Sequence, residues 1–204
     1  MACHTQQQDV GRERIFEGTR CEDSLPVAVK FTAKTENEPY IGLPDHPRPG
    51  PLEVALTVMD NQGPRCGHII KVLDWHLYIM VLERPSPCVD MHYIWEHPGG
   101  LFREDLALYF MWQVIATAAV CCSREVFHRD IKMPNLVSTE TLEVNLIDFG
   151  CGDLLKSSSY ITYSGTARYC PPEYSEKGEY YANDVVAFPR QQRHRMDGSD
   201  TCNS

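Results

Sequence analysis

The stretch His128-Arg129-Asp130-Ile131-Lys132-Met133-Pro134-Asn135, followed by Asp148-Phe149-Gly150, decides how the whole chain is interpreted. It brings four polar side chains onto two short segments. A carboxylate such as Asp130 can accept a proton from a hydroxyl group, and an ammonium group such as Lys132 can neutralise a moving phosphoryl group. The amide oxygen of Asn135 and the carboxylate of Asp148 are the hard oxygen ligands that Mg²⁺ prefers. Together these side chains suit phosphoryl transfer.

The same residues resemble the catalytic loop and the metal-binding Asp-Phe-Gly turn of protein kinases. Lysine two positions after the aspartate is similar to the serine/threonine branch of that family. The resemblance implies that Asp130 and Lys132 are catalytic and that Asn135 and Asp148 bind Mg²⁺. It also implies that ATP donates the phosphoryl group.

Upstream, branched residues predict strands at 15–19 and 25–31, and Val27-Ala28-Val29-Lys30 resembles the kinase strand whose lysine holds the ATP phosphates. A helix is predicted from Pro51 onwards, because one face carries the apolar residues Leu52, Ala55, Leu56 and Met59. Glu53 lies beside this face, where a kinase has the glutamate that pairs with the strand lysine. Two alternatives stay open: Lys30 is a solvated lysine, and Glu53 is a first-turn residue favoured by the helix dipole.

Residues 68–75 and 77–82 predict two more strands, followed by Glu83-Arg84-Pro85. This tripeptide resembles the hinge of the Pim family of serine/threonine kinases, whose backbone binds adenine, so Glu83 is a candidate for nucleotide binding. Pro85 has no N–H group, so this hinge offers one donor fewer. Five prolines between residues 39 and 51 predict an irregular connector before the helix.

Helices are predicted at 89–97 and at 103–122, and the second has the pattern of a core helix. Glu125 follows, at a position where the family commonly has a glycine with positive φ. If the backbone conformation is the same here, a residue other than glycine destabilises the fold by about 1 kcal/mol. Residues 148–173 resemble a kinase activation segment. A phosphate on one of its hydroxyls could pair with Arg129, or its serine run is simply a flexible loop.

The composition predicts a globular protein, because 43% of the 204 residues are hydrophobic and 23% are charged. A net charge of −9 argues against nucleic acid and anionic membranes as partners, and favours protein substrates that are basic around the phosphorylated Ser or Thr. The nine cysteines form no Cys-x-x-Cys pair, which argues against a disulfide framework or a zinc site. We therefore expect a monomer in the cytoplasm or the nucleus.

The predicted fold is α+β: an incomplete, two-lobed, protein-kinase-like fold with a small β-sheet lobe and an α-helical lobe. We expect a disordered leader at 1–14, a sheet lobe at 15–82 without a glycine-rich loop and a hinge at 83–87. A partial helical lobe at 88–185 and a disordered tail at 186–204 complete the prediction. The resemblance covers roughly residues 15–181, so we expect a gene product shortened at both ends.

Two functions follow from these observations. The first is an ATP-dependent serine/threonine kinase of Pim-like type, which the four polar residues favour. The second is a non-catalytic, kinase-derived binding module, which the missing glycine-rich loop and helices favour.

Overall fold

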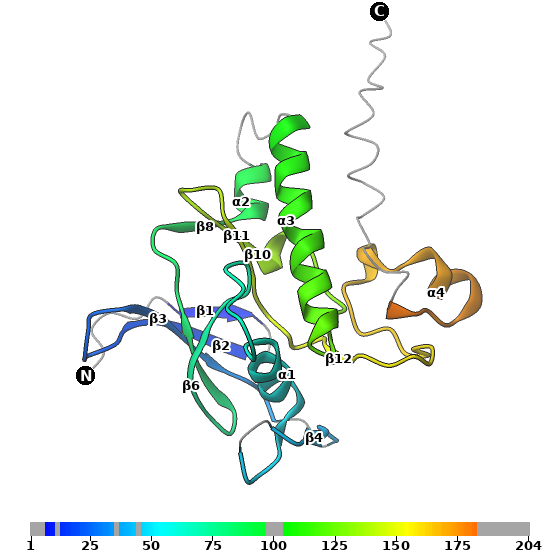
Figure 1. Cartoon of the computed structure of the whole chain (residues 1–204), viewed down its shortest axis with the longest axis horizontal. Coiled ribbons are helices and arrows are strands. Elements are labelled where there is room, and N and C mark those ends of the chain that lie inside the picture. The colour runs from blue at the N-terminus through cyan, green and yellow to red at the C-terminus, as the bar shows by residue number, and fades with distance from the viewer. Residues whose placement is uncertain (1–6, 11–12, 35–36, 44–45, 97–103, 183–204) are drawn as a thin grey trace, which may run out of the picture.

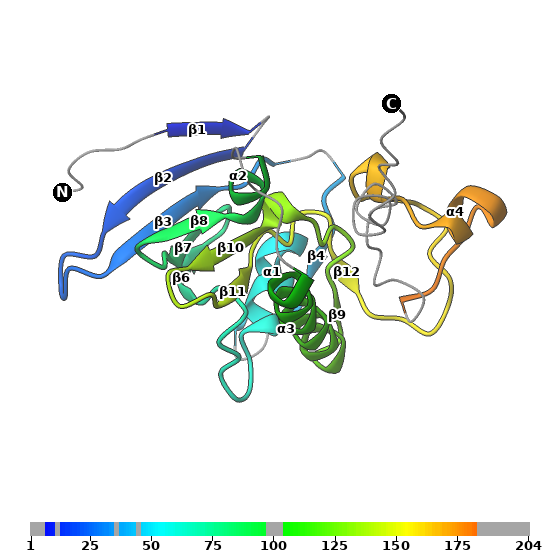
Figure 2. The same ribbon diagram turned by 90° about the horizontal axis from the view of Figure 1, so that it is seen from above.

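The computed structural model describes residues 7–10, 13–34, 37–43, 46–96 and 104–182. Figure 1 shows an antiparallel sheet built mainly from the first part of the chain, with helix α1 (Leu52–Asp60) lying between it and the long helix α3 (Glu104–Ser123). Seen from above, the segment after β12 (Asp153–Leu154) extends away from the sheet on the far side of α3 (Figure 2). The chain therefore has a sheet part and a helix-containing part, as an α+β fold requires.

The larger sheet has the strand order β1-β2-β3-β7-β6, and its neighbouring strands are antiparallel. It consists of β1 (Gln7–Val10), β2 (Glu13–Thr19), β3 (Pro26–Phe31), β7 (Ile79–Glu83) and β6 (Val72–His76). The prediction of a disordered leader is wrong where β1 and the start of β2 lie. Residues 1–6 and 11–12 are outside the described part of the chain.

Helix α1 begins at Leu52, one residue later than predicted, because Pro51 is its N-cap residue and ends strand β5. Val54, Ala55 and Leu56 are fully buried, so this helix is a core element on more than one face. The proline-rich connector before it is more regular than predicted. Two short strands, β4 (Tyr40–Ile41) and β5 (Gly50–Pro51), pair antiparallel within it.

The predicted pair of strands before the hinge is present but shorter, since β6 begins at Val72 and β7 at Ile79. The predicted helix at 89–97 is partly wrong. Residues Cys88–Asp90 form strand β8, and helix α2 covers only Met91–Glu96, while residue 97 lies outside the described residues. Strand β8 completes a three-stranded sheet with β10 (Leu136–Thr139) and β11 (Val144–Leu146).

Helix α3 agrees with the predicted helix at 103–122 to within one residue at its C-terminal end, and residue 103 lies outside the described residues. Its inner side contributes Phe110, Val114 and Cys121 to a core shared with Leu56 of α1. By length and composition alone α3 could cross a membrane, a property that core helices of soluble proteins share. Glu125, just beyond it, has φ of 61°, the left-handed conformation predicted from the sequence.

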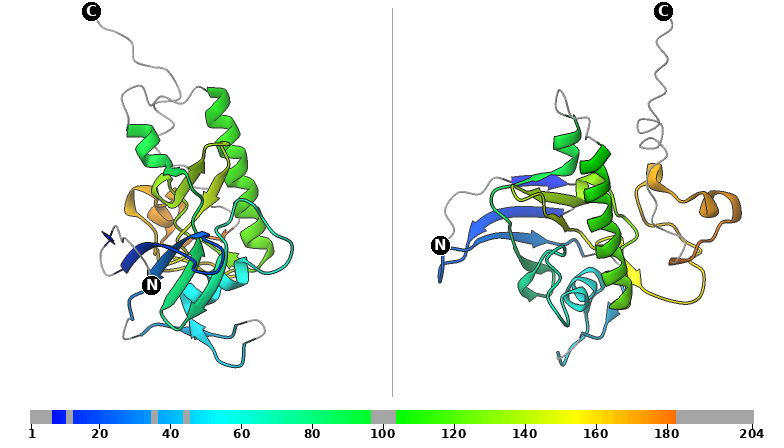
Figure 3. Two further views of the ribbon diagram at one scale, coloured as in Figure 1. Left: turned by 90° about the vertical axis from the view of Figure 1, so that its left-hand side faces the viewer. Right: turned by 45° about the horizontal axis from the view of Figure 1, so that its top comes forward.

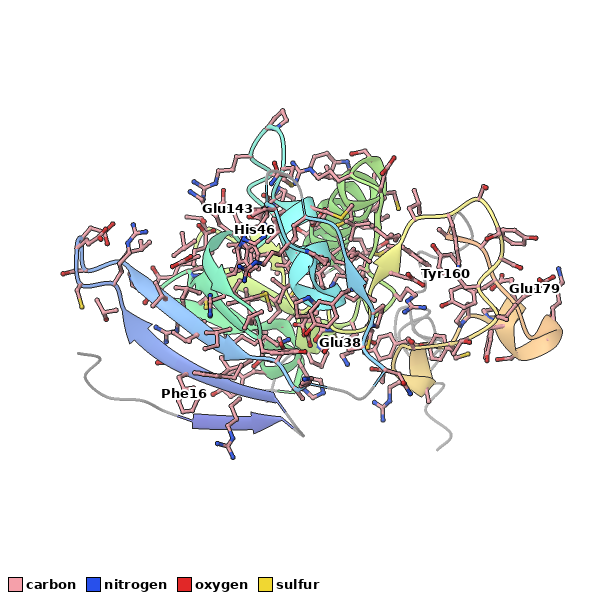
Figure 4. All side chains as sticks on the ribbon, turned by 90° about the horizontal axis from the view of Figure 1, so that it is seen from below. Phe16, Glu38, His46, Glu143, Tyr160 and Glu179 are labelled. Atoms are coloured by element: carbon pink, nitrogen blue, oxygen red, sulfur yellow. The ribbon has the colours of Figure 1, made fainter. Side chains whose placement is uncertain are left out.

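After α3 the chain forms β9 (Val126–Phe127), which pairs with β12, then the short helices η1 (Met133–Asn135), η2 (Ala167–Tyr169) and α4 (Pro172–Lys177). An aromatic cluster of Phe127, Tyr160 and Tyr180 holds the later segment together. Figure 4 places Tyr160 in this segment and Phe16 on β2 at the opposite side of the molecule. The predicted tail at 186–204 lies outside the described residues, and the predicted lobe and hinge boundaries stay predictions.

Candidate active site

The candidate site is built around Lys30, which lies on β3 with only 3% of its surface exposed. Its ammonium group contacts Oε1 of Glu53 at 2.6 Å and Oδ1 of Asp148 at 2.7 Å. The predicted Lys30–Glu53 ion pair is therefore present in the structure. The alternative, a solvated lysine, is wrong because Lys30 is buried. One buried cation thus joins the sheet, helix α1 and the Asp-Phe-Gly turn.

Asp148 has φ of 68°, which turns its carboxylate back toward Lys30, and the N–H of Gly150 also donates to Oδ1 at 3.2 Å. Burial by itself would raise the pKa of Asp148, but the charge and the hydrogen bond of Lys30 outweigh it and lower that pKa. The carboxylate is therefore held in its ionised form, the form that binds a metal ion.

Asp130 is 5% exposed and both of its carboxylate oxygens are engaged. Oδ1 accepts a hydrogen bond from the backbone N–H of Thr166 at 2.9 Å, and Oδ2 contacts Nζ of Lys132 at 2.7 Å. Nζ of Lys132 also donates to Oγ1 of Thr166 at 2.6 Å. These contacts join the segment that contains the predicted catalytic residues Asp130 and Lys132 to the segment around Thr166. Thr166 joins the site without having been predicted, because its main link is a backbone group.

Asn135 lies on η1 and points toward the same carboxylate. Its amide nitrogen donates to the backbone oxygen of Asp130 at 2.9 Å and to Oδ2 at 3.2 Å. Its backbone oxygen accepts from the N–H of Ile147 at 3.0 Å, which ties it to the residue just before Asp148. The two predicted magnesium ligands thus lie on segments that are bonded to each other.

These donors fit a magnesium ion of the kind that binds through few protein ligands. Within the described residues no group of three His, Cys, Asp or Glu side chains could hold a metal ion alone. Mg²⁺ commonly takes one or two carboxylate or amide oxygens and completes its shell with water and substrate phosphates. Asn135 and Asp148 would supply such a partial set.

His128 contacts the residues next to Asp130 and Asp148, and it was not among the predicted site residues. It is 2% exposed, its Nε2 lies 3.1 Å from the backbone oxygen of Ile147, and its ring packs against Phe149 at 4.7 Å. The N–H of Asp130 donates to Nδ1 at 3.3 Å, so Nε2 carries the proton. Burial lowers the pKa of His128, which keeps this ring neutral.

Glu83 is the predicted site residue that the structure does not bring to this cluster. It ends β7, and its carboxylate lies 3.4 Å from Arg65. The backbone N–H groups around it are also engaged, since Glu83 donates to Lys71 and Arg84 donates to Pro26. With Pro85 unable to donate, adenine would meet mainly backbone oxygens here.

Arg129 is held within the protein rather than open to a phosphate. Its guanidinium donates to the backbone oxygens of Cys151 at 2.7 Å and Gly152 at 3.0 Å, and it lies 3.5 Å from Asp153. A phosphate on the activation segment would have to compete with these bonds, so the predicted pairing stays a prediction.

Residues 14–187 match the family model described as "Protein kinase domain". The chain belongs to the protein kinase family. It is 36% identical to serine/threonine-protein kinase pim-2 of Danio rerio over 184 residues, which cover 85% of this chain and 59% of that relative.

Two further relatives carry similar names. The chain is 31% identical to serine/threonine-protein kinase prk-2 of Caenorhabditis elegans, over 85% of this chain and 39% of the relative. It is 30% identical to the PAS domain-containing serine/threonine-protein kinase of Mus musculus, over 78% of this chain and 12% of the relative. The chain thus spans less than two thirds of each of these kinases.

Proposed function

We propose that this chain is a Pim-like serine/threonine protein kinase that transfers the γ-phosphoryl group of ATP to hydroxyl groups of basic protein segments in the cytoplasm or nucleus. Two clusters of polar contacts carry this proposal. In the first, Lys30 pairs with Glu53 and Asp148. In the second, Lys132 pairs with Asp130 and donates to Thr166. The names of the relatives support the Pim-like assignment. The net charge of −9 supports basic substrates.

In the proposed reaction Asp130 orients the substrate hydroxyl and accepts its proton, while Lys132 stabilises the negative charge on the transferred group. Lys30, fixed by Glu53, binds the non-transferred phosphates. Mg²⁺ held by Asn135 and Asp148 would neutralise charge on the phosphates. The neutral His128 donates to the backbone next to Asp148, so that no second positive charge competes for this carboxylate.

The test measures transfer of radiolabelled phosphate from Mg·ATP to a basic serine peptide by the purified chain. Asp130→Asn removes the proton acceptor and should lower the transfer rate by about 10²–10⁴-fold while nucleotide binding persists. Asp148→Asn should weaken Mg·ATP binding as well, measured by thermal shift. Asp74→Asn, the same change at an exposed residue of β6, is the matched control and should alter neither. Full activity after the first two changes would contradict the proposal.

A second candidate is a non-catalytic, kinase-derived binding module. The outer side of α3 favours it, since Leu108 and Trp112 are 56% and 66% exposed and such apolar surfaces bind partners. In the same assay this candidate predicts no phosphate transfer that depends on Asp130. It makes no demand on nucleotide binding.

A further inference from the structure

The last turn of α1 contains a buried acid that the proposed reaction does not use. Asp60 is 0% exposed. Its Oδ2 accepts a hydrogen bond from the thiol of Cys121 on α3 at 3.3 Å, and its Oδ1 has no hydrogen-bond partner among the described residues. A thiol is a weak donor. The carboxyl group is therefore enclosed with less hydrogen bonding than an ionised acid needs.

The backbone at this point is also fixed from α3. The guanidinium of Arg124, one residue beyond α3, donates to the backbone oxygens of Asp60 and Pro64. Asn61, which follows α1, donates to Ile70 and accepts from the N–H of Val72. The C-terminal end of α1 is thus joined to α3 and to β6, and Asp60 lies at the centre of this junction.

The N-terminal end of the same helix carries Glu53, which binds Lys30 at 2.6 Å. Seven residues are close to two helical turns, so Glu53 and Asp60 project from nearly the same face of α1. Thr57 lies between them on that face and donates to the backbone oxygen of Glu53 at 2.7 Å. A short, stiff helix therefore connects the Asp60 junction to the lysine of the candidate active site.

From this geometry we propose that Asp60 is a positioning residue: in its protonated form it seats α1 against α3 and so holds Glu53 on Lys30, and its ionisation loosens that seat. Ionisation places a negative charge in an enclosed site at the C-terminal end of a helix, where the helix dipole is also negative. The link to nucleotide binding rests on the kinase function proposed above. The link between Asp60 and the opening of α1 does not.

The groups that act on Asp60 are few. Burial raises its pKa to about 6, against the opposing effects of the Cys121 hydrogen bond and the Arg124 charge. Burial raises the pKa of Cys122 of α3, and the charge of ionised Asp60 raises that pKa further. The remaining ionisable groups on elements packed against α1 are exposed or engaged elsewhere: Tyr40 with Tyr78, Asp153 with Arg129, and the exposed Asp74 and His76.

The first test measures hydrogen exchange of the α1 amides in the full chain, comparing wild type with Asp60→Asn at the same pH. The amide imitates the uncharged acid and cannot ionise. If opening exposes a carboxyl group with a pKa of 3.8 that is about 6 when closed, the wild type should exchange faster than the variant by about 100-fold at pH 7. This ratio should fall about tenfold by pH 5. Amides of β2, which contributes no residue to the core clusters that contain α1, provide the internal reference.

A second variant and a second readout complete the test. Cys121→Ala removes the thiol donor and should enlarge the pH dependence of α1 exchange. The Kd of wild type for Mg·ATP, divided by that of Asp60→Asn, should rise between pH 5 and pH 7, because the apparent affinity falls with the fraction of chains in which α1 is seated. Equal α1 exchange in wild type and Asp60→Asn at both pH values overturns the proposal. A changed exchange ratio with a constant Kd ratio overturns the positioning role and leaves Asp60 a stability residue. Absence of all nucleotide binding would overturn the proposed function, while hydrogen exchange would still decide whether Asp60 controls α1.

Discussion

The two ends of α1 treat a buried acid in opposite ways. At the first turn, Glu53 is 8% exposed and meets the ammonium group of Lys30, which Asp148 also contacts. At the last turn, Asp60 is 0% exposed and meets a thiol. The first acid contacts a full opposite charge, so ionisation is compatible with burial. The carboxyl group of the second is bonded only to a thiol, and the nearby charge of Arg124 offsets burial only in part, so burial favours the proton. The difference shows that the partner determines what a buried carboxyl group does to the fold. Figure 3 shows α1, in cyan, between the sheet and α3.

The largest effect should come from Lys30→Met, which leaves Glu53 and Asp148 close together without their cation. Removing one partner of a buried ion pair typically costs about 3–5 kcal/mol, because the remaining charge is left uncompensated. Urea denaturation at pH 7 should show this loss. A Lys30→Met/Glu53→Leu double variant is the matched control and should recover part of it, since one of the two orphaned charges is gone.

The pH dependence of the same variant follows from Asp148, whose pKa is lowered in the folded protein. A depressed pKa contributes stability above the ordinary value of 3.8 and loses it as the pH falls through the folded value. The stability gap between wild type and Lys30→Met should therefore narrow on acidification below about pH 4. A gap that stays constant would mean that the Lys30–Asp148 contact adds little in solution.

Asp60→Asn should change stability in the opposite direction to Glu53→Gln, although both replace an acid by its amide on one helix. The folded pKa of about 6 lies above the ordinary 3.8, so the acid costs stability as the pH rises through this window. We expect Asp60→Asn to stabilise the protein by up to roughly 3 kcal/mol above pH 6 and hardly at all below pH 4. Glu53→Gln should destabilise it by about 1.5–3 kcal/mol at pH 7. Chemical denaturation at several pH values measures both, and a loss of stability in both variants would remove the contrast between the two ends.

The sequence predicted the first end of α1 and missed the second. Glu53 was found because it combines a recognisable family position with a helix start. Asp60 also had a signal, since it lies four residues after Leu56 and eight after Leu52, on the predicted apolar stripe. A polar residue on such a stripe is buried when the helix packs. Its partner Cys121 is 61 residues away, however, and nothing in the local pattern pairs the two.

The same physical limit explains the other successes and failures. Asp130, Lys132 and Asn135 lie within six residues, so the sequence itself largely places them together. Thr166 reaches Asp130 through a backbone N–H across 36 positions, and backbone groups carry no residue signature. Strands β1 and β8 were missed because the chain around them lacks the alternating pattern of a half-buried strand. Their existence depends on their neighbours β2 and β10.

The smallest effect should come from Glu125→Gly, which separates overall stability from the Asp60 junction. Glu125 has φ of 61° and is exposed, and it follows Arg124, which holds the end of α1. Glycine adopts this left-handed conformation without the steric cost of a Cβ atom, so the variant should gain up to about 1 kcal/mol, measured by urea denaturation. Ser123→Gly, on the last helical residue, is the control and should lose about the same amount. Because Glu125→Gly leaves Glu53 and Asp60 unchanged, it should shift the free energy of unfolding equally at pH 4 and pH 7. A gain that grows with pH would mean that the turn after α3, and not the Asp60 carboxyl group, carries the pH dependence of the α1–α3 contact.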